Sequence, residues 1–185
     1  MRTVQKITQT PLLQQLNRTK LLTHGMKIYN APYEGGAFTF KLNGITTPFA
    51  PSVFNGTGEE TRQSVVFSIP EDVYKLLRSF EDGFKAQLSA SECPKVEEMW
   101  HSSLKPADKY AATFRAKINL SGDKACAFFT TEQEPTKAPS SWRGLEVSAV
   151  IRIGGVYIQT RGAGMLCEVT HLQYEQPQEQ SNPFA

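Results

Sequence analysis

The sequence predicts a mainly β protein: a small closed β-barrel with an inserted amphipathic helix and a disordered C-terminal tail. Apolar and polar residues alternate over many short segments, which is typical of half-buried strands. One segment near the middle has helical spacing, and the last ten residues offer almost nothing to bury. A β-sandwich is compatible with the same pattern of strands.

The length of the chain, 185 residues, fits one domain. We expect residues 1–175 to form that domain, with a helical insert at about 70–100, and residues 176–185 to form a flexible tail. No apolar run approaches the roughly 20 residues that cross a bilayer, and the N-terminus lacks the hydrophobic centre of a signal peptide. The sequence therefore predicts a soluble, intracellular protein without membrane contact.

The first third of the chain predicts a short helix followed by strands. Thr10 and Pro11 are suited to cap and begin a helix over 10–16. Strands are predicted at 26–29, 37–42 and 62–69, with a long loop at 47–58 because that segment contains two prolines and two glycines. Gly35 and Gly36 predict a hairpin turn between the first two strands.

Residues 70–88 predict the main helix. Pro70 stands near its start, and Glu71 and Asp72 favour the exposed amides of the first turn. Apolar residues follow at helical spacing: Val73, Leu76, Leu77, Phe80, Phe84 and Leu88. We expect this stripe to pack against the sheet, and a second, short helix to follow at 94–100.

The second half of the chain predicts further strands, at 111–120 and 125–130, then a polar loop at 132–141 and three short strands that end near residue 174. Alternation places Arg115 and Lys117 on the outward face of the first of these strands. From residue 145 the predicted inward residues are Leu145, Val147, Ala149, Ile151 and Ile153. Arg152 falls on the opposite face, and after a break at Gly154-Gly155 so do Tyr157, Gln159 and Arg161.

The net charge of +2 conceals an uneven distribution along the chain. Residues 1–69 carry 7 basic and 3 acidic side chains, and residues 101–162 carry 9 and 5, so each segment has a net charge of +4. The predicted helical insert, 70–100, carries 4 basic and 7 acidic side chains, and 163–185 carries 3 acidic ones, a net −3 in each. Basic strands beside an acidic helix and tail indicate an anionic partner.

The sequence contains no pattern typical of a catalytic, metal or cofactor site. The histidines, His24, His101 and His171, lack metal-ligand spacing, and no nucleophile elbow or phosphate-binding loop is present. The three cysteines form no CxxC pair, so we expect buried free thiols. We therefore predict a protein that is not an enzyme and needs no cofactor.

Basic and aromatic side chains on outward strand faces favour nucleic-acid binding. Single-stranded nucleic acid is bound by cations that follow the phosphates and by aromatic rings on which bases stack. The predicted contact residues are Arg62, Arg115, Lys117, Trp142, Arg143, Arg152, Tyr157 and Arg161. For Trp142 and Tyr157, packing within the fold is an equal alternative. RNA is chemically as suitable as DNA, because every base has a face to stack.

A structural or assembly role remains the alternative function, in which a β-sandwich uses its aromatic loops as protein interfaces. Self-association of the chain is left open by both interpretations. The alternative predicts oligomers without nucleic acid and little response to oligonucleotides.

The order of these segments resembles the OB-fold single-stranded DNA-binding proteins of large DNA viruses and phages. The resemblance rests on PFAPSVFNGTGEETRQSVVFSIP before the helix, FRAKINLSG after it and WRGLEVSAVIRIGGVYIQ near the end, and covers roughly 27–174. It implies a five-stranded barrel with an inserted helix. It also implies that the protein coats transient single strands during replication or recombination, at the site of DNA replication in the host cell.

The C-terminal tail lightly resembles the tip of single-stranded DNA-binding proteins, where an acidic tail ends in a Pro-Phe pair that docks into partner proteins. Here the pair is Pro183-Phe184, followed by Ala185, and only Glu175 and Glu179 are acidic nearby. The resemblance implies docking to replication or recombination proteins through Pro183 and Phe184.

Overall fold

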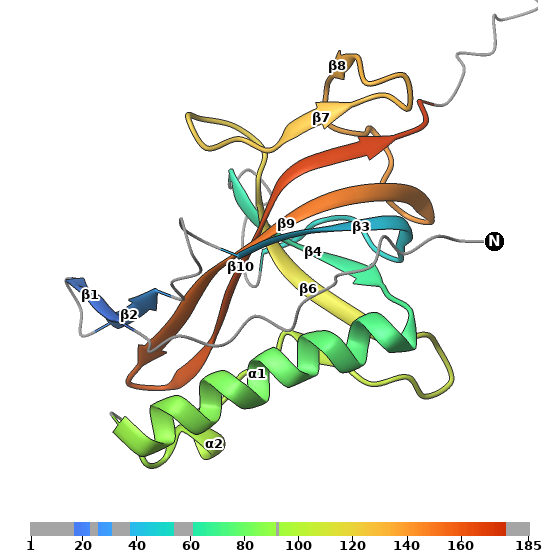
Figure 1. The fold of residues 1–185 in the computed structure, drawn as a ribbon. Helices are drawn as coiled ribbons and strands as arrows, with labels where there is room; N and C mark the ends of the chain where they lie inside the picture. The colour runs from blue at the N-terminus through green and yellow to red at the C-terminus, as the bar shows by residue number, and fades with distance from the viewer. Residues whose placement is uncertain (1–16, 23–25, 31–37, 54–60, 92, 177–185) are drawn as a thin grey trace, which may run out of the picture.

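Strands dominate the part of the chain that the structure describes. This structure, a computed structural model, describes residues 17–22, 26–30, 38–53, 61–91 and 93–176 (Figure 1). The strands are β1 (Asn17–Leu22), β2 (Met26–Asn30), β3 (Phe38–Thr47), β4 (Arg62–Ser68), β5 (Leu104–Lys105), β6 (Thr113–Asn119), β7 (Ala127–Phe129), β8 (Pro135–Thr136), β9 (Leu145–Gln159) and β10 (Gly162–Tyr174). The helices α1 (Glu71–Ser91) and α2 (Val96–Met99) lie between β4 and β5 in the chain.

Five of these strands close into a ring, as the predicted barrel requires. Around the ring, β9 pairs with β3, β3 with β4, β4 with β6, β6 with β10, and β10 again with β9. The β6–β10 pairing is parallel and the other four are antiparallel. Two of these pairings are short. β3 pairs with β4 only at Thr46 and Ser68, and β6 pairs with β10 at two positions. A partly open five-stranded barrel is typical of the OB fold, and two stacked sheets are not what forms.

The barrel interior is filled by the inward residues that alternation predicts. On β9, Val147, Ala149, Ile151 and Ile153 are buried, and Leu145 is half-buried at the end of the strand. On β6, Phe114, Ala116 and Ile118 are buried while Arg115 and Lys117 are exposed. Burying a valine, isoleucine or phenylalanine side chain stabilises the fold by about 1.5–3 kcal/mol. The same alternation sends the basic residues to the outer surface.

Two long strands, β9 and β10, replace the three short strands predicted at the C-terminal end. That prediction was wrong because Gly154-Gly155 does not break the strand. Gly155 has a φ of 137°, and the register with β10 shifts between Leu166 and Cys167. The chain absorbs one extra residue as a bulge, which bends the strand without ending it. The β9–β10 hairpin consequently extends beyond the ring (Figure 1).

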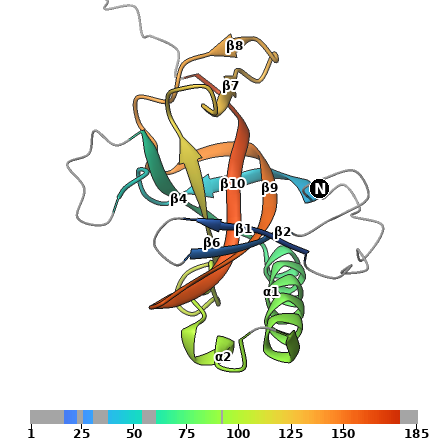
Figure 2. The same ribbon diagram turned by 90° about the vertical axis from the view of Figure 1, so that its left-hand side faces the viewer.

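The first strands also pair differently from the prediction. Gly35 and Gly36, the predicted hairpin turn, lie outside the described residues. The strands on either side of them do not pair with each other: β2 pairs with β9 at 155–158, and β3 pairs with β9 at 145–153. β1 was not predicted, and it pairs with β2 beside the extended hairpin (Figures 1 and 2). The predicted helix at 10–16 lies outside the described residues.

The helix α1 lies along one end of the barrel, as the apolar stripe predicts (Figure 1). Its buried hydrophobic residues are Val73, Leu77, Phe80, Phe84 and Leu88. Phe80 packs against Phe38 of β3, with ring centroids 5.1 Å apart. None of the described helices has both the length and the apolar character that a membrane span needs.

A buried carboxylate fastens α1 to the connection that follows α2. Glu81 is fully buried; its carboxylate accepts a 2.6 Å hydrogen bond from the Ser102 hydroxyl and a 2.8 Å bond from the Ser103 amide. The Ser103 carbonyl in turn accepts a hydrogen bond from the Arg115 amide at 2.8 Å. The helical insert thus positions the backbone of β6 where the basic residues begin.

Candidate functional site

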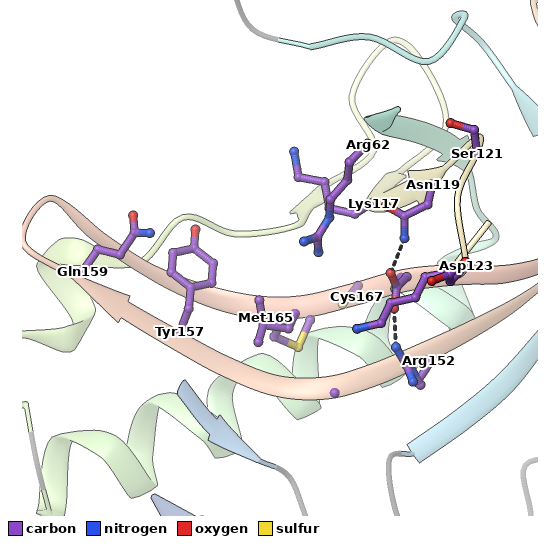
Figure 3. Close-up of a pocket in the computed structure, with 14 residues that line it drawn as sticks. Arg62, Lys117, Asn119, Ser121, Asp123, Arg152, Tyr157, Gln159, Met165 and Cys167 are labelled. Carbon is purple, nitrogen blue, oxygen red and sulfur yellow. Dashed lines mark hydrogen bonds and ion pairs between the residues drawn. The ribbon is translucent and has the colours of Figure 1, made fainter. Parts of the chain in front are cut away.

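A broad groove lies on the outer surface of the barrel, over β4, β6, β9 and β10 (Figure 3). Its volume is about 1240 Å³. Pockets for small molecules have volumes of about 300–1,000 Å³, so this groove suits an extended ligand. We call it the cationic groove; its polar lining residues are Arg62, Lys117, Asn119, Ser121, Asp123, Lys124, Arg152, Tyr157, Gln159 and Glu168.

Three cations from neighbouring strands gather in and beside this groove: Arg62 of β4 and Arg115 and Lys117 of β6. All three are exposed, and no ion pair between described residues includes any of them. The pKa of Lys117 is lowered, first because the groove walls remove part of its hydration and then because Arg62 and Arg115 repel its charge. Its ammonium donates a 2.8 Å hydrogen bond to the Ser64 hydroxyl, which is a neutral partner. Asp123 and Glu168 also line the groove, but neither forms an ion pair with these three cations. Like charges held together without an ion-pair partner among the described residues favour an anionic ligand.

A fourth cation, Arg152 of β9, has a partner. Its guanidinium forms an ion pair with Glu168, which lies opposite on β10 (Figure 3). Glu168 also accepts a 2.6 Å hydrogen bond from the side-chain amide of Asn119. The carboxylate thus holds Arg152 in one orientation and neutralises its charge while the groove is empty.

Tyr157 supplies an aromatic ring to the groove. The side chain is half-buried and points from β9 into the groove (Figure 3). Burial raises the pKa of its hydroxyl, although the charge of Arg115 acts in the opposite direction. The ring is therefore neutral at physiological pH, as base stacking on an aromatic platform requires.

A glycine on the next strand makes room for this ring. Gly164 lies opposite Tyr157 in the β9–β10 ladder. A Cβ at Gly164 would lie 3.1 Å from the Tyr157 ring and 2.9 Å from the His101 carbonyl oxygen. His101 is itself tied to the hairpin, since its amide donates a 2.7 Å bond to the Ala163 carbonyl. The Gly162-Ala163-Gly164 segment thus serves close packing as well as the hairpin turn.

Two predicted contact residues lie at opposite ends of the β9–β10 hairpin, away from the cationic groove. Arg143 is exposed just before β9, and Arg161 is exposed in the turn between β9 and β10. Neither lines the groove. The structure therefore brings together Arg62, Lys117, Arg152 and Tyr157, with Arg115 beside them, and leaves Arg143 and Arg161 apart.

Trp142 was predicted at the rim of the binding surface, but the structure places it in the core. The side chain is only 8% exposed and packs edge-on against Phe128 of β7, with ring centroids 6.2 Å apart. The Thr47 hydroxyl donates a hydrogen bond to its carbonyl oxygen. The loop between β8 and β9 folds back over β7 and so buries the indole, which removes Trp142 from the predicted stacking positions.

Six polar residues that line the groove are not among the predicted contact residues: Asn119, Ser121, Asp123, Lys124, Gln159 and Glu168. Asn119 continues the outward alternation of Arg115 and Lys117, so the strand pattern could have included it. Glu168 could not be found in this way, because its partner lies 16 residues earlier across the hairpin. Pro183 and Phe184 lie outside the described residues. Among the described side chains, no cluster of histidine, cysteine and carboxylate groups is arranged to hold a metal ion.

Comparison with known proteins gives structural matches only. No protein-family model matches the chain, and no curated protein matches its sequence. A C-terminal truncation of the single-stranded DNA-binding protein from bacteriophage Enc34 matches with a TM-score of 0.53 at 15% identity, over 91% of this chain and 98% of that chain. A second structure of the single-stranded DNA-binding protein from bacteriophage Enc34 matches with a TM-score of 0.50 at 14% identity, over 91% of this chain and 96% of that chain.

A second phage supplies a further match. The single-stranded DNA-binding protein gp2.5 encoded by bacteriophage T7 has a TM-score of 0.56 at 13% identity, over 76% of this chain and 87% of that chain. Identities this low establish a shared fold and no more. Over most of its length, the chain therefore has the OB-like fold of the single-stranded DNA-binding proteins of bacteriophages Enc34 and T7.

Proposed function

We propose that this protein binds and protects single-stranded DNA in the cationic groove, by phosphate contacts and base stacking and without catalysis. The observation that carries the proposal is the convergence of Arg62, Arg115 and Lys117 beside the neutral ring of Tyr157. Cations attract the phosphates, and a base stacked on an aromatic ring contributes about 1–3 kcal/mol. Coating of transient strands in replication or recombination is the role that such binding supports.

A single strand fits this surface better than a duplex. Sequence readers of duplex DNA insert a helix or a two-stranded ribbon into the major groove. Here α1 turns its apolar stripe to the barrel and begins with two acidic residues, Glu71 and Asp72. Tyr157 can stack on the face of a base only when that base is not stacked on its neighbours in the nucleic acid. RNA shares this chemistry, and the test below includes it.

The direct test is fluorescence anisotropy with a fluorescein-labelled oligo-dT, followed at salt concentrations from about 50 to about 200 mM. We expect sub-micromolar affinity that weakens steeply with salt, because phosphate contacts release counterions. Unlabelled single-stranded DNA should compete, duplex of the same length should compete poorly, and oligo-rU measures the RNA preference. Equal affinity for single strand and duplex would overturn the proposal.

The absence of catalysis is tested on the same complex. The labelled oligonucleotide, incubated with the protein and magnesium or manganese, should stay intact on a denaturing gel. Nuclease activity that co-elutes with the protein in size-exclusion chromatography would show that the protein is a nuclease instead. Docking of Pro183-Phe184 to replication or recombination proteins remains a prediction. It requires that deleting 183–185 abolish partner binding and leave oligo-dT affinity unchanged.

A further inference from the structure

A second, smaller depression lies on the outer surface of the same hairpin. Its volume is about 480 Å³. Its lining includes Lys41 of β3, Val150 of β9, His171 and Gln173 of β10, and Phe129 of β7. We call it the distal depression. It includes none of the residues that line the cationic groove.

Two aromatic rings stand parallel in the distal depression. The rings of Phe129 and His171 have centroids 6.1 Å apart and planes inclined by only 19°. His171 is exposed and Phe129 is half-buried. A hydrogen bond of 3.0 Å from the Gln173 side chain to the Thr130 carbonyl holds the end of β7 against β10. The two rings are thus stacked on each other and form a braced aromatic platform, whose exposed ring, His171, is available for a base to stack on.

A cation accompanies this platform. Lys41 is exposed on β3, where it pairs with Val150 of β9, and Val150 pairs in turn with His171 of β10. The three side chains therefore form one row across the sheet. Within the described part of the chain, Lys41 takes part in no ion pair. Its ammonium is available to a phosphate next to a base on the rings.

The distal depression continues the face of the cationic groove. Arg152 and Glu168 face each other in the β9–β10 ladder, and Val150 and His171 form the next outward row. Two residues along a strand span about 7 Å, so the depression begins one row of side chains beyond Arg152. A ligand that follows the hairpin from Tyr157 past Arg152 reaches the two rings without leaving this face.

We propose that the distal depression is a second base-stacking subsite for the same single strand of DNA. A base stacks on the Phe129–His171 platform, and Lys41 contacts the adjoining phosphate. The proposal rests on the proposed function and extends it, since it states where the strand goes after the cationic groove. It also makes affinity depend on length: only a strand long enough to fill both sites gains from Phe129, His171 and Lys41.

The test is a series of oligo-dT lengths from about 4 to about 16 nucleotides, bound to the wild type and to His171→Ala, Lys41→Gln and Phe129→Ala. For the shortest oligonucleotides that still bind, we expect the variants to have the same affinity as the wild type. For long oligonucleotides, the loss of one stacked base should weaken binding by about 5- to 100-fold. Tyr110→Ala serves as the control, because that ring is 85% exposed and lines neither site.

The outcomes separate this proposal from the proposed function. Wild-type binding with no length-dependent loss in His171→Ala and Lys41→Gln overturns the distal subsite alone. A loss of equal size at every length overturns it as well, because that loss would reflect damage to the whole groove. No wild-type binding at any length overturns both proposals. His171 and Lys41 are exposed, so these two variants should keep the wild-type melting temperature even if Phe129→Ala does not fold.

Discussion

Arg152 of β9 and Glu168 of β10 face each other across the antiparallel ladder and form an ion pair on the floor of the cationic groove. Glu168 is 16% exposed and also accepts the side-chain hydrogen bond of Asn119. The carboxylate thus lies between the Arg152 guanidinium and the Asn119 amide, a position that would otherwise suit a phosphate. Arg152 can contact DNA fully only by exchanging one anionic partner for another.

Replacing this carboxylate should strengthen DNA binding. Glu168→Gln keeps the shape of the side chain but removes the negative charge that competes with phosphate. We expect oligo-dT affinity to rise about three- to tenfold, as for a charge interaction of about 1 kcal/mol in a solvated groove. Anisotropy titration measures it, with Glu98→Gln on α2 as an exposed control that should change nothing. Weaker binding by Glu168→Gln would show that Glu168 chiefly positions Arg152.

The ring of Tyr157, rather than its hydroxyl, should carry the stacking contribution. Tyr157→Ala should weaken oligo-dT binding about 5- to 100-fold, whereas Tyr157→Phe should bind nearly as well as the wild type. Ionisation of this hydroxyl should not weaken binding between pH 7 and pH 9, since burial raises its pKa above its usual value of 10.0, so Tyr157→Phe should show the same pH dependence as the wild type. Tyr110→Ala is the matched control. A large loss in Tyr157→Phe would assign the role to the hydroxyl.

The cations of the groove should set the salt dependence of binding. Each phosphate contact on a single strand contributes about 0.7 to the slope of log affinity against log salt concentration. Lys117→Gln, and separately Arg62→Gln, should each reduce the slope by about that amount. Lys109→Gln, an exposed change between β5 and β6, should leave the slope unaltered. Unchanged slopes in both groove variants would mean that the phosphates follow another path.

A methyl group at Gly164 should disturb the site and the fold together. Gly164→Ala places a Cβ 2.9 Å from the His101 carbonyl oxygen and 3.1 Å from the Tyr157 ring. Overpacking of this kind costs about 1–3 kcal/mol of unfolding free energy. Thermal unfolding should show a lower melting temperature, and the shifted ring should weaken oligo-dT binding. Gly154→Ala is the control for the melting temperature, because its Cβ would meet only the Leu166 carbonyl oxygen at 3.9 Å.

Local alternation predicted the parts of the fold that depend on burial alone. The inward residues of β9, the apolar stripe of α1 and the outward positions of Arg115 and Lys117 all follow from periods that a core imposes on strands and helices. Closure of the barrel was predicted because it removes the strand edges that such a strand-rich chain would otherwise expose.

Long-range pairing accounts for what the sequence could not predict. Gly155 adopts a φ of 137° within a continuous strand, and only its pairing with β10 distinguishes a bulge from a break. Trp142 is buried because the loop after β8 returns to β7, which no local pattern encodes. Glu168 and the distal rings of Phe129 and His171 depend on which strands become neighbours.

Photo-cross-linking tests most directly whether the cationic groove holds the strand. Oligo-dT carrying 5-iodouracil, irradiated in complex with the wild-type protein and analysed by mass spectrometry, reports which aromatic side chains contact bases. We expect adducts on Tyr157, and their loss when unlabelled oligo-dT is in excess. Phe49 and Tyr110 are exposed outside the groove in the described part of the chain. Adducts that are confined to these two rings and are lost on competition would contradict the central claim.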